Sequence, residues 1–130
     1  RLLSIGSWDA IRWLRGQLEK IPAGCYVAHV SRAANRSLFL PVYPPRFPLS
    51  FDNGQALDVR VVEQGRCVVY VHGSICTSAE GRPACEAFER SLDLEIAART
   101  TWPAAPSFDS LPYDRDTVEC WVARVRGPRR

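Results

Sequence analysis

The clearest alternation of apolar and polar residues lies at 56–73, where two valine-rich runs flank the dipeptide Gln64-Gly65. A two-residue turn at this dipeptide would join the runs as an antiparallel hairpin. In that register, directly opposed residues share a face of the hairpin. One face is then apolar and comprises Leu57, Val59, Val61, Val68 and Tyr70. The other face holds two charged residues among apolar ones, so we expect a second sheet, the segment 99–116 or a partner to cover it.

Residues 7–21 have the spacing of an amphipathic helix, because apolar side chains recur every three or four positions. The apolar stripe consists of Trp8, Ile11, Leu14, Leu18 and Ile21. Ser7 is a favourable N-cap, and the proline and glycine within residues 22–24 end the helix. We expect the helix to pack on the apolar face of the hairpin. Trp13 falls outside the stripe and is expected to be partly exposed.

Further short runs predict β-strands. These strands cover residues 25–30, 37–43, 49–51, 87–98 and 117–126. Pro41 lies inside the second of them and indicates an edge strand, because proline cannot donate to a neighbouring strand. In the last strand, Val118, Cys120 and Val122 take one face, and Trp121, Ala123 and Val125 take the other. The segment 99–116 contains three prolines and is expected to be a long surface connection.

The segment 83–97 fits two patterns. Apolar and acidic positions alternate through most of it, which favours a strand over 87–98 with a helical turn before it that begins at Pro83. The alternative is a helix through the whole segment, with an apolar stripe comprising Cys85, Phe88, Leu92 and Ile96. Leu94 lies outside that stripe, so we prefer the strand.

Together these elements predict a mainly β domain, an antiparallel sheet or sandwich of about six strands with the 7–21 helix packed on it. A small α+β fold is the alternative. The length of residues 1–130 indicates a single domain, and a hydrophobic content of 46% is enough to build a core without a metal. The sequence contains no methionine, so we expect the chain to be a fragment of a larger protein.

The charge balance does not suggest a protein that coats nucleic acid, because the formal net charge is only +3. A basic run near the C-terminus comprises Arg124, Arg126, Arg129 and Arg130. This run could contact phosphates, but no aromatic residues are interleaved with it, so weak nucleic-acid binding is only a second alternative. No apolar run approaches the roughly 18 residues of a membrane-spanning helix, so no membrane span is expected.

The five cysteines are Cys25, Cys67, Cys76, Cys85 and Cys120. None forms a Cys-x-x-Cys motif, which argues against a zinc ribbon or a thioredoxin-type site. Cys76 and Cys85 flank a predicted loop and could form a disulfide in an oxidising compartment, but we favour reduced thiols and an intracellular setting. A nucleophile–base pair could join Cys25 or Cys67 to His29 or His72. No family signature surrounds these residues, so we prefer structural roles for both histidines.

The sequence therefore favours a non-catalytic interaction or structural module, for which no cofactor or metal is expected. A Cys/His-dependent enzyme or accessory factor is the first alternative. The expected contact surface is the proline-rich segment that holds Tyr43, Arg46 and Phe47, with Trp13 or Trp102 as a further anchor. The expected partner is another protein or peptide, or a second copy of the chain that pairs through an edge strand.

Overall fold

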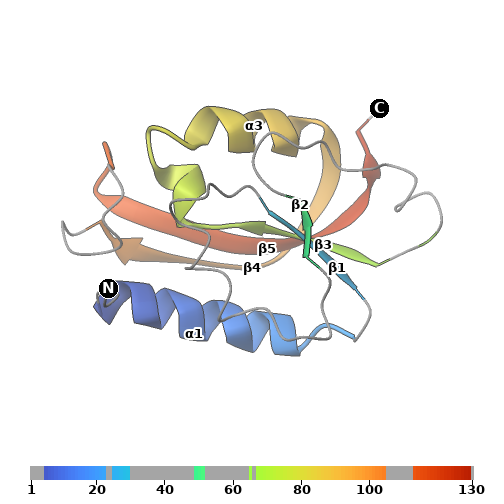
Figure 1. Ribbon diagram of the computed structural model, residues 1–130, viewed down its shortest axis with the longest axis horizontal. Helices are drawn as coiled ribbons and strands as arrows, with labels where there is room; N and C mark the ends of the chain where they lie inside the picture. Colours follow the sequence, from blue (N-terminus) through green and yellow to red (C-terminus); the bar gives the residue numbers. More distant parts are fainter. Residues whose placement is uncertain are drawn as a thin grey trace.

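The computed structural model describes residues 5–22, 25–29, 49–51, 65, 67–104 and 113–129. Its elements are the helix α1 (Ile5–Glu19), the strands β1 (Tyr26–His29), β2 (Leu49–Phe51) and β3 (Val68–His72), the 3-10 helix η3 (Ser74–Thr77), the helix α3 (Arg82–Arg90), and the strands β4 (Leu92–Pro103) and β5 (Thr117–Pro128). The strands form one mixed sheet in the order β2-β1-β3-β5-β4, with α1 and α3 on opposite faces (Figure 1). The described part is thus a small α+β fold, and the expected antiparallel sandwich of six strands is wrong. None of its helices is long and apolar enough to cross a membrane.

The strand β3 lies at the centre of the sheet and is paired along both edges. It runs parallel to β1, with Val69 opposite Val27, and antiparallel to β5, with Val71 opposite Val122. The predicted hairpin is therefore wrong along β3, because neither edge is left for a strand arriving from the turn at Gly65. Gly65 itself has a φ of 74°, which suits the predicted turn glycine. Its predicted partner run lies outside the described residues.

The helix α1 covers the face of the sheet that carries Val69 and Val71. Its buried residues Leu14 and Leu18 pack in one cluster with these two valines and Val122. The predicted helix is confirmed, but it begins at Ile5, before the expected N-cap. It also covers the opposite face of β3 from the one predicted, since the predicted face was that of Val68 and Tyr70.

The helix α3 covers the other face, where Tyr70 and Leu92 are fully buried. The segment 83–97 contains both a helix and a strand. Arg82–Arg90 is helical with Pro83 in its first turn, Ser91 caps it, and β4 starts at Leu92. The helical pattern was right for the first half of the segment, and the strand pattern was right from Leu92 onward. The two patterns were hard to separate because the apolar alternation in Leu92–Ile96 follows directly on the helical stripe. Both faces of β3 are thus covered by helices of the chain. The face of Val69 and Val71 was expected to lie under a second sheet, the segment 99–116 or a partner, and α1 covers it instead.

The strands β4 and β5 form a long antiparallel pair of twelve residues each. The predicted last strand and its two faces are confirmed, since Val122 packs beneath α1, whereas Trp121, Ala123 and Val125 pack on the side of α3. The expected connection over 99–116 is wrong in its first part, because β4 continues to Pro103. The predicted edge strand at 37–43 lies outside the described residues.

Candidate functional site

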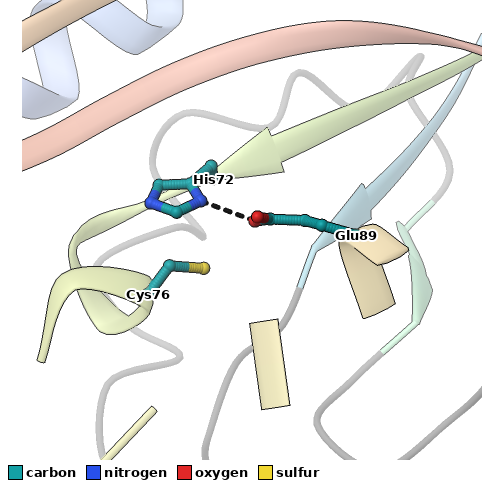
Figure 2. A group of neighbouring side chains, drawn as sticks. All are labelled: His72, Cys76 and Glu89. Atoms are coloured by element: carbon teal, nitrogen blue, oxygen red, sulfur yellow. Dashed lines mark hydrogen bonds and ion pairs between the residues drawn. The ribbon is translucent and has the colours of Figure 1, made fainter. Parts of the chain in front are cut away.

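Three polar side chains meet between β3 and α3. Tyr70 and His72 are two residues apart on β3, so both point to the face that α3 covers. Glu89 lies in the last turn of α3 and points toward the sheet (Figure 2). The Tyr70 hydroxyl donates to Glu89 Oε2 at 2.7 Å, and His72 Nδ1 donates to the same oxygen at 2.5 Å. One carboxylate oxygen therefore ties the central strand to the helix.

The cluster is largely closed to solvent. Tyr70 is fully buried, and the side chains of His72 and Glu89 are 10% and 20% exposed. Burial, together with the charge and hydrogen bond of Glu89, raises the pKa of Tyr70 well above its usual range. The phenol thus stays protonated and remains a donor. The His72 ring stacks on Trp121 with a centroid distance of 4.6 Å, and its Nε2 has no hydrogen-bond partner among the described residues.

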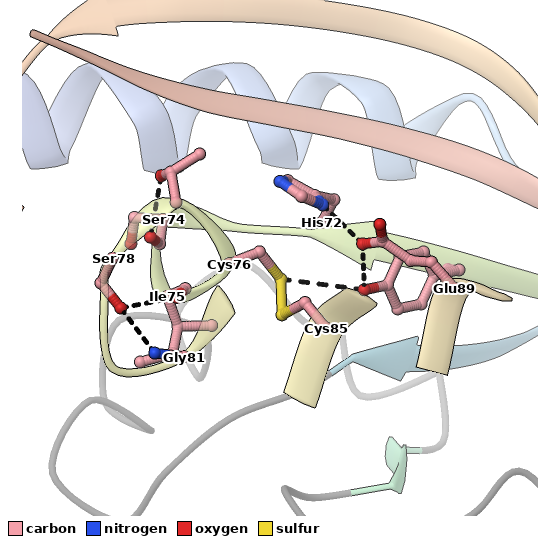
Figure 3. Close-up of a disulfide and its surroundings, with 10 residues drawn as sticks. His72, Ser74, Ile75, Cys76, Ser78, Gly81, Cys85 and Glu89 are labelled. Atoms are coloured by element: carbon pink, nitrogen blue, oxygen red, sulfur yellow. Dashed lines mark hydrogen bonds and ion pairs between the residues drawn. A yellow bond between two sulfur atoms is a disulfide. The ribbon is translucent and has the colours of Figure 1, made fainter. Parts of the chain in front are cut away.

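A disulfide between Cys76 and Cys85 lies beside these side chains (Figure 3). Cys76 is in η3, and Cys85 is in α3 one turn before Glu89. The sulfur of Cys76 is 3.7 Å from the Tyr70 hydroxyl. Both cysteines are buried, so the disulfide joins η3 to α3 within the core of the domain.

A second disulfide joins Cys25 to Cys67, close to the starts of β1 and β3. Cys120 is buried and belongs to neither disulfide. The expectation of reduced thiols is therefore wrong for four of the five cysteines, because the fold brings Cys25 and Cys67 together from positions 42 residues apart. The alternative nucleophile–base pair is wrong as well, since Cys25 and Cys67 are bonded to each other and have no thiolate to offer.

The connection from η3 to α3 is held by hydrogen bonds around Ser78. Its hydroxyl donates to the carbonyl of Ile75 at 2.7 Å and accepts from the backbone N–H of Gly81 at 3.0 Å. A β-carbon on Gly81 would lie 2.2 Å from the Ile75 carbonyl oxygen, so only glycine fits this close approach. These contacts fix the positions of the two cysteines relative to each other.

Of the predicted binding residues, the structure describes Trp13 and Trp102. Their rings meet edge to face with centroids 6.0 Å apart, and both side chains are half-buried. This contact joins α1 to β4, so each ring is partly used in internal packing. Tyr43, Arg46 and Phe47 lie outside the described residues.

The predicted basic run lies beside a shallow hollow of about 390 Å³. This hollow is lined by Gly65, Cys67, Val68, Glu95, Arg124, Val125 and Arg126. Arg126 donates to Glu95, so the acidic residue balances one of its two arginines. The hollow is consequently less basic than the sequence run suggested.

Sequence reasoning missed the cluster of Tyr70, His72 and Glu89. The available signal was the pair Cys85 and Glu89, which are four residues apart and share one face of a helix. That signal required the helical alternative for the segment 83–97. Comparison with protein families, curated proteins and solved structures finds no match to this chain.

Proposed function

We propose that this chain is a non-catalytic protein-interaction domain that binds an extended segment of a partner along the outer edge of β4. The observation that carries the proposal is the position of this strand. It is twelve residues long and last in the strand order, and among the described residues it pairs only with β5. A long strand edge presents backbone donors and acceptors that another extended chain can use.

The second half of β4 suits this role best. A bulge interrupts the pairing with β5 between Ile96 and Ala98, but the register is regular from Ala98 to Trp102. Bulges hinder the pairing of an edge, so the regular part offers the longer continuous template. The half-buried Trp102 ends this stretch, and the sequence had singled it out as an anchor.

The side chains next to this stretch resemble a small binding surface. Ile96 is 51% exposed, and no other large hydrophobic side chain among the described residues is as exposed. Ion pairs form on either side of it along the strand, between Arg99 and Glu119 and between Arg126 and Glu95. An apolar spot with a charged rim is the usual pattern of a protein interface.

The candidate site supports a structural role rather than catalysis. Tyr70 and Glu89 are committed to internal hydrogen bonds, and the nearby sulfurs are joined in a disulfide. Two disulfides in so small a domain are typical of an oxidising compartment, which we propose in place of an intracellular one.

The proposal is tested by blocking the edge of β4. Successive backbone N–H groups of a strand point to opposite edges, so one of the variants Thr100→Pro and Thr101→Pro removes an outward donor and keeps the pairing with β5. The variant that keeps the thermal stability of the parent protein is the edge-blocked one. The probes are peptides selected from a random display library on the oxidised parent protein.

We expect the selected peptides to bind the parent protein and to lose at least tenfold in affinity for the edge-blocked variant, roughly the effect of losing one to two hydrogen bonds. The matched control is Thr100→Val or Thr101→Val at the same position, which keeps the backbone donor and should bind like the parent. Equal binding of the peptides to the parent and the edge-blocked variant would refute the proposal.

A further inference from the structure

We propose that reduction of the disulfide between Cys76 and Cys85 turns the candidate site into a Zn²⁺ site, with His72, Cys76, Cys85 and Glu89 as its four ligands. The inference rests on the cluster itself and is independent of the proposed binding edge. The site would hold either a disulfide or a metal ion, because the same two sulfurs are needed for both.

The positions of the ligand atoms carry this inference. The nearest ligand atoms of His72, Cys76 and Glu89 all lie within 4.8 Å of one another. In a tetrahedral zinc site with bonds of about 2.0–2.3 Å, neighbouring ligand atoms are about 3.5 Å apart. Ligand atoms at the upper limit of 4.8 Å would approach each other by about 1 Å, and His72 Nδ1 and Glu89 Oε2, which are 2.5 Å apart, would separate by about 1 Å. Changes of side-chain rotamer can supply both movements. Cys85 provides the fourth ligand, because its sulfur is already bonded to that of Cys76.

The local structure explains why these four residues converge. Cys85 and Glu89 are four residues apart on α3 and so project from the same face of the helix. His72 ends β3, and Cys76 follows it after four residues in η3. Two pairs of ligands, each with the same spacing, thus approach from two elements. Nitrogen, sulfur and carboxylate ligands from separate short motifs are the usual donors of zinc.

The surroundings would hold the ligands in place. The Tyr70 hydroxyl donates to Glu89, and the His72 ring stacks on Trp121. Such contacts outside the ligand set orient the ligands and strengthen metal binding. Cys76 and Cys85 are each at most 2% exposed, so the ion would be held in a dry environment.

The chemical steps balance with a dithiol as the reductant. The dithiol supplies two electrons and two protons and becomes a disulfide, while the Cys76–Cys85 bond breaks to give two thiols. Binding of Zn²⁺ releases the two thiol protons to solvent. His72 coordinates through Nδ1 as the neutral tautomer that carries its proton on Nε2, so a proton on Nδ1 passes to Nε2 by exchange with solvent and the neutral ring releases none.

The experiment uses the full chain. The protein is unfolded in guanidinium with a phosphine in place of the dithiol. The phosphine supplies the two electrons and becomes a phosphine oxide, and water supplies its oxygen and the two thiol protons. The protein is then refolded by dilution, with or without one equivalent of Co²⁺, which reports on zinc sites by its absorption. We expect a thiolate-to-cobalt charge-transfer band and the visible bands of tetrahedral cobalt, with a stoichiometry of one ion per chain. Zn²⁺ should abolish both sets of bands, and the oxidised protein should show neither.

Variants separate this site from the other cysteine pair. Cys25→Ala/Cys67→Ala should keep the cobalt spectrum, whereas Cys76→Ala/Cys85→Ala should lose it. Glu89→Gln should weaken zinc binding at least about tenfold. The parent spectrum requires no substitution, so it decides the question even if a variant fails to fold. Absence of cobalt bands in the reduced parent, or bands that survive in Cys76→Ala/Cys85→Ala, would overturn the inference. Peptide binding is measured on the oxidised protein, so its result is separate from this one.

Discussion

The two disulfides should differ in how much they stabilise the fold, and the difference follows from the loops that they close. Cys25 and Cys67 are 42 residues apart, whereas Cys76 and Cys85 are 9 residues apart. In the chain-entropy description, a disulfide removes more freedom from the unfolded chain when it closes a longer loop. The two loops do not overlap in the sequence, so each should contribute independently.

The loop lengths translate into free energies of unfolding. The longer loop corresponds to about 4 kcal/mol and the shorter one to about 2.7 kcal/mol at 25 °C. We therefore expect Cys25→Ala/Cys67→Ala to lower the free energy of unfolding by about 1.3 kcal/mol more than Cys76→Ala/Cys85→Ala does. Each variant removes two sulfur atoms from largely buried positions, so the packing losses cancel in part when the two variants are compared.

The assay is reversible urea unfolding followed by tryptophan fluorescence, with disulfides mapped by mass spectrometry in the parent protein and in each variant. Trp121 beside His72 and the contact of Trp13 with Trp102 should make the fluorescence sensitive to folding. A larger loss in Cys76→Ala/Cys85→Ala would refute the entropic reasoning. It would mean that the contacts of the shorter disulfide within the native fold outweigh the constraint that the longer one puts on the unfolded chain.

Two further predictions concern the candidate site and the turn beside it. The pKa of Tyr70 is raised in the folded state, whereas an unfolded tyrosine ionises near pH of about 10. The Tyr70 hydroxyl therefore contributes fully to stability below that pH. Above it, the contribution falls by up to about 1.4 kcal/mol per pH unit, because ionisation favours the unfolded chain. Tyr70→Phe should lower the free energy of unfolding by about 1–3 kcal/mol at pH 7, and this deficit should shrink between pH 10 and 12; a constant deficit would contradict the assignment. Gly81→Ala should lower the free energy of unfolding by about 1–3 kcal/mol, because the new methyl group meets the Ile75 carbonyl. The control Gly16→Ala has open space around it and should stabilise α1 by about 0.5–1 kcal/mol, so equal effects in the two thermal melts would contradict this account.

Local patterns predicted the elements whose environment is regular. The helix α1 was predictable because one side of it contacts the sheet, which leaves a stripe with helical spacing. The strand β5 was predictable because its two faces contact different helices and its residues alternate accordingly. In both cases a single periodic signal runs through the sequence of the element, and the burial of the described residues, such as Leu14 and Leu18 in α1, agrees with it.

Pairing between strands was not predictable in the same way. The run Val68–His72 is buried on both faces, so its sequence holds no polar positions that would distinguish one face from the other. A run of this kind is typical of a central strand with parallel neighbours. The turn signal at Gln64-Gly65 instead suggested a hairpin, because the run just before the turn could pair with this strand through a loop of only two residues. The sheet uses β1 and β5 as the neighbours of this strand, and those pairings depend on contacts far apart in the sequence.

The candidate site was missed for a related reason. Its residues come from a central strand, a short 3-10 helix and a helix whose pattern overlaps that of the following strand. Cys85 and Glu89 fall on one face only if the segment is helical, and they meet Tyr70 and His72 only if that helix covers β3. A single error about secondary structure therefore concealed the juxtaposition that both the disulfide and the proposed metal site require. The cluster thus depends on the fold as a whole. Glu89 is the residue whose replacement should report most directly on it, because one of its carboxylate oxygens is hydrogen-bonded to both Tyr70 and His72.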